Sequence, residues 1–310
     1  MTSYTLGATG THRGRTFVLE GRSLVRGGRS AWNEWTLRFD ERTVFLSEWA
    51  GSLTLYDEAS IVPAFEAFVP GTPAFGWTVV ERGEARRIAS WGSAAAGAGP
   101  YRYVDLSSTT GVRATIDYRG AEPRVFLGSK VTTDDLGLTA EPARFFPTAE
   151  VSRPREVDLW LEVGAEGTVE ATPFRVLGIV SRSTEVRWDE YALYDPRVGL
   201  RWLVLADGHW SLATAIEPGC VAVSESGARF EGTTYVRRAT ADARVDWASG
   251  ELTWEVAIGD VASVTDFACE DGATLTCEGI PGAVSWTRSV PLPTDAVAQA
   301  FGKRTLPRPR

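Results

Sequence analysis

The stretch Leu200-Arg-Trp-Leu-Val-Leu-Ala-Asp-Gly-His-Trp-Ser-Leu-Ala-Thr-Ala-Ile216 decides the fold class. Its first six residues, 200–205, are apolar on both faces of an extended chain, which is typical of a buried strand. Asp207-Gly208 suits the two positive φ angles of a type I′ turn, so the chain is predicted to reverse there. The stretch therefore predicts an antiparallel β-hairpin.

Similar strand signals recur through the 310 residues. Short runs rich in Val, Thr, Trp, Tyr and Phe are interrupted about every 8–12 residues by Gly, Pro, Asp or Asn, which indicates a β-sandwich or barrel. A second hairpin is predicted, with strands at Ala243–Trp247 and Glu251–Ile258 and a turn at 248–250. The alternation of apolar and polar residues in its second strand indicates that one face is buried.

Helix signals are few. One short helix is expected at Ser60–Phe68, where Pro63 limits the start. Another is expected at Thr294–Phe301, with Thr294 as the N-cap and Asp295 in the positively polarised first turn.

The two halves of the chain resemble each other. Trp32-Asn-Glu34-Trp35 aligns with Trp188-Asp-Glu190-Tyr191 at an offset of 156, and Phe17–Gly21 aligns with Phe174–Gly178 at an offset of 157. This self-similarity predicts a tandem duplication of one mostly β domain. Looser matches pair Tyr103–Asp105 with Val264–Asp266, and Val131–Leu138 with Pro293–Ala300.

The predicted fold is therefore mainly β, with two related modules of small barrel or sandwich type and one or two short helices. The first copy is assigned to residues 1–150 and the second to residues 151–310. Residues 139–165 are rich in Pro and Glu and form the expected linker.

Charge excludes some partners. The formal net charge is −8, and the second copy holds most of it, with 16 basic and 23 acidic residues against 16 and 17 in the first. This balance argues against non-specific nucleic-acid binding and against adhesion to anionic membranes. Because no apolar run is long enough to span a bilayer and no signal peptide is evident, we expect a cytoplasmic protein without membrane insertion.

Cysteine and histidine are scarce. Cys269 and Cys277 flank a Glu-Asp-Gly turn signal, so a thiol pair or disulfide is one interpretation, and two ordinary small residues are the other. With His12 and His209 as the only histidines, no metal site is expected. No phosphate-binding or dinucleotide-binding glycine motif follows a strand, so no cofactor is expected.

Asp189, Glu190 and His209 are the candidate catalytic residues. A carboxylate beside an aromatic face can have a raised pKa and act as a general acid, and Trp188 shares a strand face with Glu190. The alternative is structural: Glu190 accepts hydrogen bonds from the backbone or an arginine while Trp188 fills the core. Glu34 at the equivalent place in the first copy favours that alternative.

Aromatic residues supply the candidate binding set. Most of the twelve tryptophans lie in alternating strand contexts that favour core packing, but an exposed tryptophan could stack on a sugar or a peptide. Trp77 and Trp91 are the best candidates for exposure. The binding candidates of the second copy are Trp188, Tyr191, Trp202, Asp207 and Trp210.

A series of short motifs runs through the second copy in a fixed order: Phe174-Arg-Val-Leu-Gly178, Trp188-Asp-Glu-Tyr191, Tyr194-Asp-Pro196, Arg201-Trp-Leu203, Asp207-Gly-His-Trp210, Gly250-Glu-Leu-Thr-Trp254, Gly259-Asp260, Asp266-Phe267, Ala300-Phe-Gly302 and Leu306-Pro307. Through these motifs the second copy, over about residues 160–308, resembles a bacterial family known as domain of unknown function 4178. The first copy resembles a degenerate member, because it lacks the Asp-Gly-His-Trp turn and the closing motif. The resemblance implies no established activity; family members look like companions of polyamine-synthesis enzymes and membrane-stress proteins.

The leading functional hypothesis is a non-catalytic binding or scaffolding protein of the bacterial cytoplasm that works with a protein partner. Two rivals stay open. One is a hydrolase-like enzyme that uses Asp189, Glu190 and His209, and the other is a carbohydrate- or peptide-binding module that uses exposed tryptophans.

Overall fold

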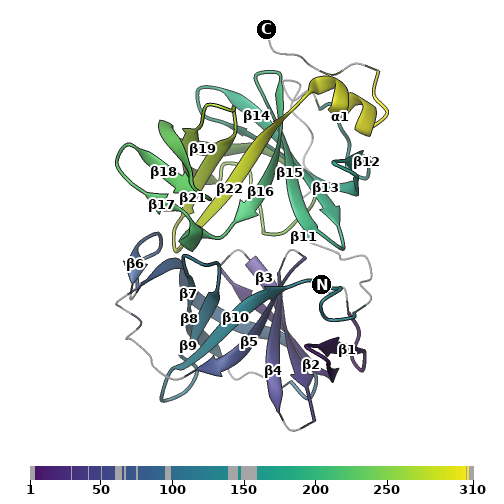
Figure 1. Ribbon diagram of the computed structural model, residues 1–310, viewed down its shortest axis with the longest axis vertical. Coiled ribbons are helices and arrows are strands. Elements are labelled where there is room, and N and C mark those ends of the chain that lie inside the picture. The colour runs from purple at the N-terminus through teal and green to yellow at the C-terminus, as the bar shows by residue number, and fades with distance from the viewer. Residues whose placement is uncertain are drawn as a thin grey trace. The chain divides into compact units, whose positions relative to one another are not determined.

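The computed structural model describes residues 4–28, 30–40, 42–49, 51–59, 65, 68–74, 76–94, 99–138, 146–147, 159–304 and 306. The chain divides into two compact units, here called the first and second modules (Figure 1). The first consists mainly of Met1–Phe145, and the second of Phe146–Asp195, Leu200–Glu217 and Val221–Arg310. Both are built from antiparallel strands, so the mainly β prediction is confirmed.

The first module is a closed eight-stranded barrel, in which each strand pairs with the next and the last returns to the first. Two short strands, β1 (Thr9–His12) and β6 (Pro73–Ala74), pair antiparallel with β2 and β7 respectively. The barrel order is β2 (Arg15–Gly27), β3 (Ser30–Arg38), β4 (Thr43–Trp49), β5 (Ser52–Ala59), β10 (Arg124–Val131), β9 (Arg113–Asp117), β8 (Pro100–Ser107) and β7 (Trp77–Gly92).

The second module repeats this order. Its strands are β13 (Thr172–Ser183), β14 (Arg187–Asp195), β15 (Gly199–Ala206), β16 (His209–Ile216), β22 (Ala283–Leu292), β21 (Thr274–Ile280), β20 (Val261–Ala268) and β19 (Thr233–Leu252). Its smaller elements are β11 (Phe146–Pro147), β12 (Glu166–Val169), β17 (Ala222–Val223), β18 (Gly227–Phe230) and the helix α1 (Thr294–Ala300). A 3₁₀ turn at Pro218–Cys220 follows β16 in the chain and is grouped with the first module.

The first predicted hairpin is confirmed and the second is wrong. Asp207 and Gly208 have φ angles of 48° and 76° and join β15 to β16, as a type I′ turn requires. Residues 248–250, in contrast, lie inside β19, which runs without reversal from Thr233 to Leu252. A glycine with positive φ can lie within a strand as well as end it, and Gly250, at φ 85°, lies within this one.

The glycine of each Phe-x-x-x-Gly motif lies opposite a second glycine on the neighbouring strand. Gly21 pairs with Gly92, and Gly178 pairs with Gly250 at the equivalent place in the second module. A Cβ atom on Gly250 would lie 2.3 Å from the carbonyl oxygen of Leu177, which no side chain could tolerate. These motifs therefore serve the closure of the barrels.

In each module an apolar patch of the sheet is covered by the segment that follows the barrel's last strand in the chain, here called the closing segment (132–138 in the first module and 293–301 in the second). Leu136 and Leu138 pack with Phe17 in the first core. Val297 and Phe301 pack with Phe174, the equivalent aromatic residue, in the second.

The helix α1 is close to its predicted place, but its cap differs. The N-cap is Pro293 rather than Thr294, and it makes no side-chain capping hydrogen bond. Asp295 does lie in the first turn. The predicted helix at 60–68 lies outside the described residues apart from Phe65 and Phe68, and so does most of the predicted linker at 139–165. The boundary near residue 150 stays a prediction.

Candidate functional site

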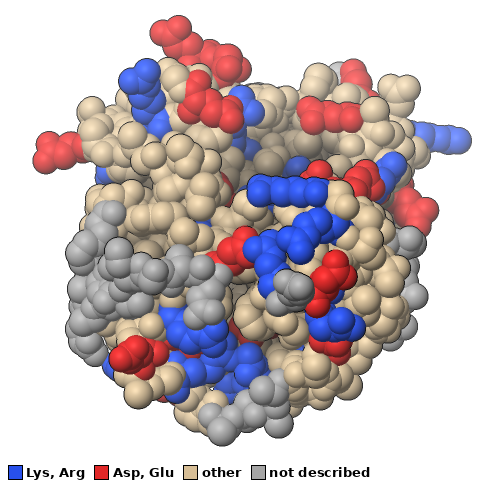
Figure 2. All heavy atoms as spheres, turned by 60° about the horizontal axis from the view of Figure 1, so that its bottom comes forward, with Lys and Arg blue, Asp and Glu red and all other residues tan. Residues whose placement is uncertain are grey.

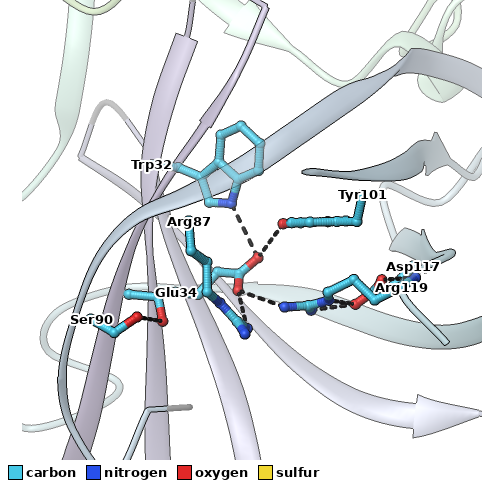
Figure 3. Close-up of polar contacts among 8 residues, drawn as sticks. Trp32, Glu34, Arg87, Ser90, Tyr101, Asp117 and Arg119 are labelled. Carbon is cyan, nitrogen blue, oxygen red and sulfur yellow. Dashed lines mark hydrogen bonds and ion pairs between the residues drawn. The ribbon is translucent and has the colours of Figure 1, made fainter. Parts of the chain in front are cut away.

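A carboxylate on β3, Glu34, lies at the centre of a polar cluster in the first module (Figure 3). Its Oε1 accepts hydrogen bonds from Trp32 Nε1 at 3.4 Å and from the Tyr101 hydroxyl at 3.3 Å. Its Oε2 accepts one from Arg87 Nη2 at 3.1 Å, and Arg119 Nη1 lies 4.0 Å away. Two cations and two neutral donors therefore surround one carboxylate.

A second carboxylate, Asp117 at the end of β9, holds Arg119 in place. Its side chain pairs with the Arg119 guanidinium and also accepts the Arg119 backbone N–H at 2.8 Å. The guanidinium lies over the Tyr101 ring, 4.4 Å from its centroid, in cation–π geometry. With Glu34 and Arg87, the cluster contains two acids and two arginines, so its formal charges cancel.

The second module builds a related cluster around Glu190. Trp188 Nε1 donates to Glu190 Oε1 at 2.7 Å, so the prediction that both side chains share a strand face is confirmed. The buried Arg182 places Nε 3.4 Å from Glu190 Oε2 and donates through Nη1 to Glu278 at 2.8 Å. Burial raises the pKa of Glu190 and Glu278 raises it further, while Arg182 opposes both effects.

The arginine of each cluster comes from a different strand. Arg182 on β13 lies opposite Val245 on β19, directly after a register shift. At the equivalent position of the first module, Val25 on β2 lies opposite Arg87 on β7, so the two residue types are exchanged. The glutamate thus has a guanidinium partner in both modules, although the strand that supplies it differs.

The two acids of each cluster occupy equivalent positions. Thr115 donates to Asp105 and Thr276 donates to Asp266, both at 2.7 Å, which sets the alignment of β9 with β21. Glu278, two residues after Thr276, is therefore the counterpart of Asp117. The second cluster has two acids but only Arg182 as its arginine among these positions.

The candidate catalytic residues are held in different environments. Asp189 is buried and accepts a hydrogen bond from the Ser181 hydroxyl at 2.5 Å. Glu190 is engaged by Trp188 and Arg182 as described above. His209 is exposed at the start of β16, and within the described chain no hydrogen bond joins it to either carboxylate.

The candidate binding residues divide between core and surface. Tyr191 and Trp210 are buried in the second core with ring centroids 5.9 Å apart. Trp202 is half-buried and packs against Trp254 at 5.5 Å. Asp207 is exposed in the β15–β16 turn. Trp188 is half-buried, so of the five candidates only Asp207 is exposed.

The predicted exposure of tryptophan in the first module is confirmed for one residue. Trp91 is 41% exposed, and the Arg22 guanidinium lies 4.5 Å from its ring centroid. Trp77 is half-buried against the core that contains Phe68 and Val79.

The two cysteines of the second module are free thiols and are not cross-strand partners. Cys277 lies opposite Thr265, while the Cys269 thiol donates to Asp271 at 2.8 Å. Burial raises the pKa of Cys277 to about 11, so this thiol stays protonated at neutral pH.

A half-buried carboxyl pair in the first module was not predicted from the sequence. Glu81 on β7 lies opposite Asp105 on β8 and accepts a hydrogen bond from the Tyr103 hydroxyl. Burial and the neighbouring Asp105 raise the pKa of Glu81 to about 7. The second module has Ala239 and Val264 in place of Glu81 and Tyr103, so the pair is specific to the first.

No signal in the sequence predicted the partners of the two Trp-x-Glu motifs. Arg87, Tyr101 and Arg119 are 53 to 85 residues from Glu34, and only the strand register brings them together. Glu278 could have been found from the looser 103–105 and 264–266 match, since continuing that alignment pairs it with Asp117.

In the described part of the chain, no three His, Cys, Asp or Glu side chains gather as a metal ion would require. The same residues include no helix with the length and apolar character that a membrane crossing needs.

Comparison with known proteins gives one result. A model of the family described as "Domain of unknown function (DUF4178)" matches residues 5–133 and 162–294. No curated protein and no solved structure matches. Because the two matches cover most of the chain and one falls in each module, both copies count as members, including the first, which lacks the closing motif. The chain therefore belongs to the DUF4178 family and contains two tandem copies of its domain.

Proposed function

We propose that this chain is a non-catalytic binding protein. The observation that carries the proposal is that the glutamates of both Trp-x-Glu motifs are engaged by the chain's own cations and aromatic donors. Glu34 is held by Arg87, Tyr101 and Trp32, and Glu190 by Arg182 and Trp188. A general acid or base must instead reach a substrate proton.

The exchange of arginine and valine between strands supports the same proposal. A buried carboxylate that has lost its cation is strongly destabilising. A guanidinium group next to the glutamate therefore stabilises the fold whichever strand supplies it. A catalytic arginine, in contrast, would have to approach the substrate from the same direction in both modules. Arg87 and Arg182 reach their glutamates from different strands.

A turnover assay tests the proposal against the enzyme hypothesis. The full chain is incubated with panels of hydrolase and transferase substrates, beside the Glu190→Gln and Glu34→Gln variants. We expect no turnover above that of heat-denatured protein for any of the three. Turnover by the native chain that is lost in Glu190→Gln, while the variant keeps its fold by circular dichroism, would overturn the proposal.

The finer parts of the proposal concern setting and partner. We propose a cytoplasmic location and a protein partner, in a membrane-stress or polyamine-linked system, because the family resemblance implies that context. The genes adjacent to the coding sequence and the proteins captured by the full chain from its native host test this part. A neighbourhood and a capture set without such proteins would remove it and leave the non-catalytic proposal in place.

A further inference from the structure

A pocket opens on the outer wall of the first module beside strands β5 and β10. It encloses a cavity of about 480 Å³. Leu127 and Ser129 of β10 lie opposite Asp57 and Leu55 of β5 and form its floor. The β1–β2 turn and the residues between β3 and β4 form its rim, and they contribute His12, Arg13, Arg15, Phe39 and Arg42.

The pocket is cationic in a protein that is acidic overall. Three arginines line it against one carboxylate, that of Asp57, while the whole chain has a formal net charge of −8. Asp57 is 3.3 Å from Arg42. Arg13 and Arg15 pair with no carboxylate among the described residues, so their charges are available to a ligand. Figure 2 turns the lower end of the first module toward the viewer and shows basic side chains gathered there in groups.

The aromatic ring of Phe39 holds two of the guanidinium groups. The Arg15 and Arg42 guanidinium carbons lie 5.9 Å and 5.7 Å from the centroid of this ring. Cation–π contact with a buried ring limits the orientations of both side chains. Planar guanidinium groups that are oriented before binding match the oxygen atoms of a phosphate group with paired hydrogen bonds.

The rest of the lining is apolar. Leu127 is 41% exposed and Val112 is 37% exposed, although both are aliphatic and belong to a folded sheet and its adjoining loop. A ligand that fits the whole pocket therefore carries an apolar group next to its anionic group. An inorganic anion would leave these side chains in water and gain nothing from them.

Resting on the proposed binding function, we propose that this pocket binds organic phosphate monoesters, with the phosphate held by Arg13, Arg15 and Arg42 and the apolar group against Leu127 and Val112. The same chemistry occurs in a soluble phosphate ester and in a phosphomonoester lipid headgroup. The experiment below separates these two sources.

The two histidines of the chain provide an internal comparison. His12 lines the pocket, while His209 is exposed in the second module. Burial and Arg13 lower the pKa of His12, Arg42 lowers it further, and Asp135 and Asp57 oppose them. A bound phosphate adds negative charge beside His12 and favours its protonated form. NMR titration of the full chain should therefore show that phenyl phosphate raises the pKa of His12. At fixed pH the same ligand should leave the ring signals of His209 in place.

The probes are phenyl phosphate, inorganic phosphate, phenol, and phosphatidylcholine vesicles with and without phosphatidic acid. Binding is measured by calorimetry for the soluble probes and by co-sedimentation for the vesicles. The Arg13→Gln/Arg15→Gln variant should weaken binding at least tenfold, because two of the three cations are lost. Arg86→Gln, at an exposed position on β7, is the matched control and should bind as the native chain does.

Each outcome decides the proposal. Phenyl phosphate that binds more tightly than inorganic phosphate or phenol, and depends on Arg13 and Arg15, supports a soluble ester. Binding confined to phosphatidic acid vesicles, with the same dependence, supports a lipid headgroup. No binding by any probe, equal binding of inorganic and phenyl phosphate, or binding unchanged in the double variant overturns the pocket assignment and leaves the non-catalytic proposal standing. Release of phenol from phenyl phosphate would instead overturn the non-catalytic proposal.

Discussion

Ile280 occupies in the second module the position that Arg119 occupies in the first. Each lies two residues after the second acid of its cluster, Glu278 or Asp117. Arg119 pairs with Asp117 and approaches Glu34, whereas Ile280 is 41% exposed and offers no charge. The second cluster therefore lacks one cation that the first one has.

Supplying that cation should stabilise the second module. We expect Ile280→Arg to raise the free energy of unfolding by about 0.5–1 kcal/mol, since the new ion pair would be partly solvent-screened. Urea unfolding measures the change. In a Glu278→Gln background the gain should vanish, and an equal gain there would show that the arginine acts elsewhere.

Removing the existing cation should have the opposite effect. We expect Arg182→Val to destabilise the second module by about 2–4 kcal/mol, because the half-buried Glu190 and Glu278 would lose their shared cation while solvent screens part of the cost. Adding Val245→Arg reproduces the arrangement of the first module and should recover a measurable part of the loss. If the double variant is no more stable than the single one, the two positions are not interchangeable.

The raised pKa of Glu81 predicts pH-dependent stability of the first module. The folded pKa is about 7 and the ordinary value is 4.5, so the folded state binds the proton more tightly than the unfolded state does. This contribution is fully present below about pH 4.5 and is lost as the pH rises through about 7. Glu81→Gln should therefore match the native chain near pH 4.5 and exceed it by about 3 kcal/mol above pH 8.

Hydrogen exchange of the β7 and β8 amides reports this effect within the first module. The second module, with Ala239 and Val264 at the equivalent positions, is the internal control and should show no such difference between variant and native chain. A difference that does not vary with pH would exclude titration of Glu81 as its cause.

The glycine contacts predict a large difference between two similar substitutions. Gly250 and Gly259 have φ angles of 85° and 88°, but only Gly250 has neighbours within 4 Å of an added Cβ atom. Gly259→Ala should cost about 1–2 kcal/mol, the penalty of the left-handed conformation alone. Gly250→Ala should cost about 1–3 kcal/mol more, because the methyl group meets the Leu177 carbonyl. Equal thermal shifts for the two variants would contradict this reason.

Local sequence was sufficient where one turn or one alternation decides the structure. The Asp207-Gly208 turn, the short helix near Thr294 and the paired Trp-x-Glu motifs depend on neighbours within a few residues. The turn predicted at 248–250 is absent because Gly250 gives the same local signal whether the strand reverses or continues. Its pairing with Gly178, 72 residues earlier in the chain, keeps it within β19.

The site could be predicted only in part. The repeat in the sequence identifies the glutamates of the two motifs and favours a structural role for them. It does not identify their arginine partners, because Arg87 and Arg182 occupy different strands and no constant spacing connects them to the glutamates. The pocket of the first module likewise combines five segments that only the closed barrel brings together.

The closing segment of the first module has a consequence for synthesis on the ribosome. Phe17 and its neighbours enter the growing chain long before Leu136 and Leu138, the residues that cover them. All the barrel strands can therefore leave the exit tunnel while one apolar face of the sheet is still uncovered. During that interval the exposed apolar face is a binding site for chaperones. A chain truncated before residue 136 would keep this face exposed and would therefore be prone to aggregate.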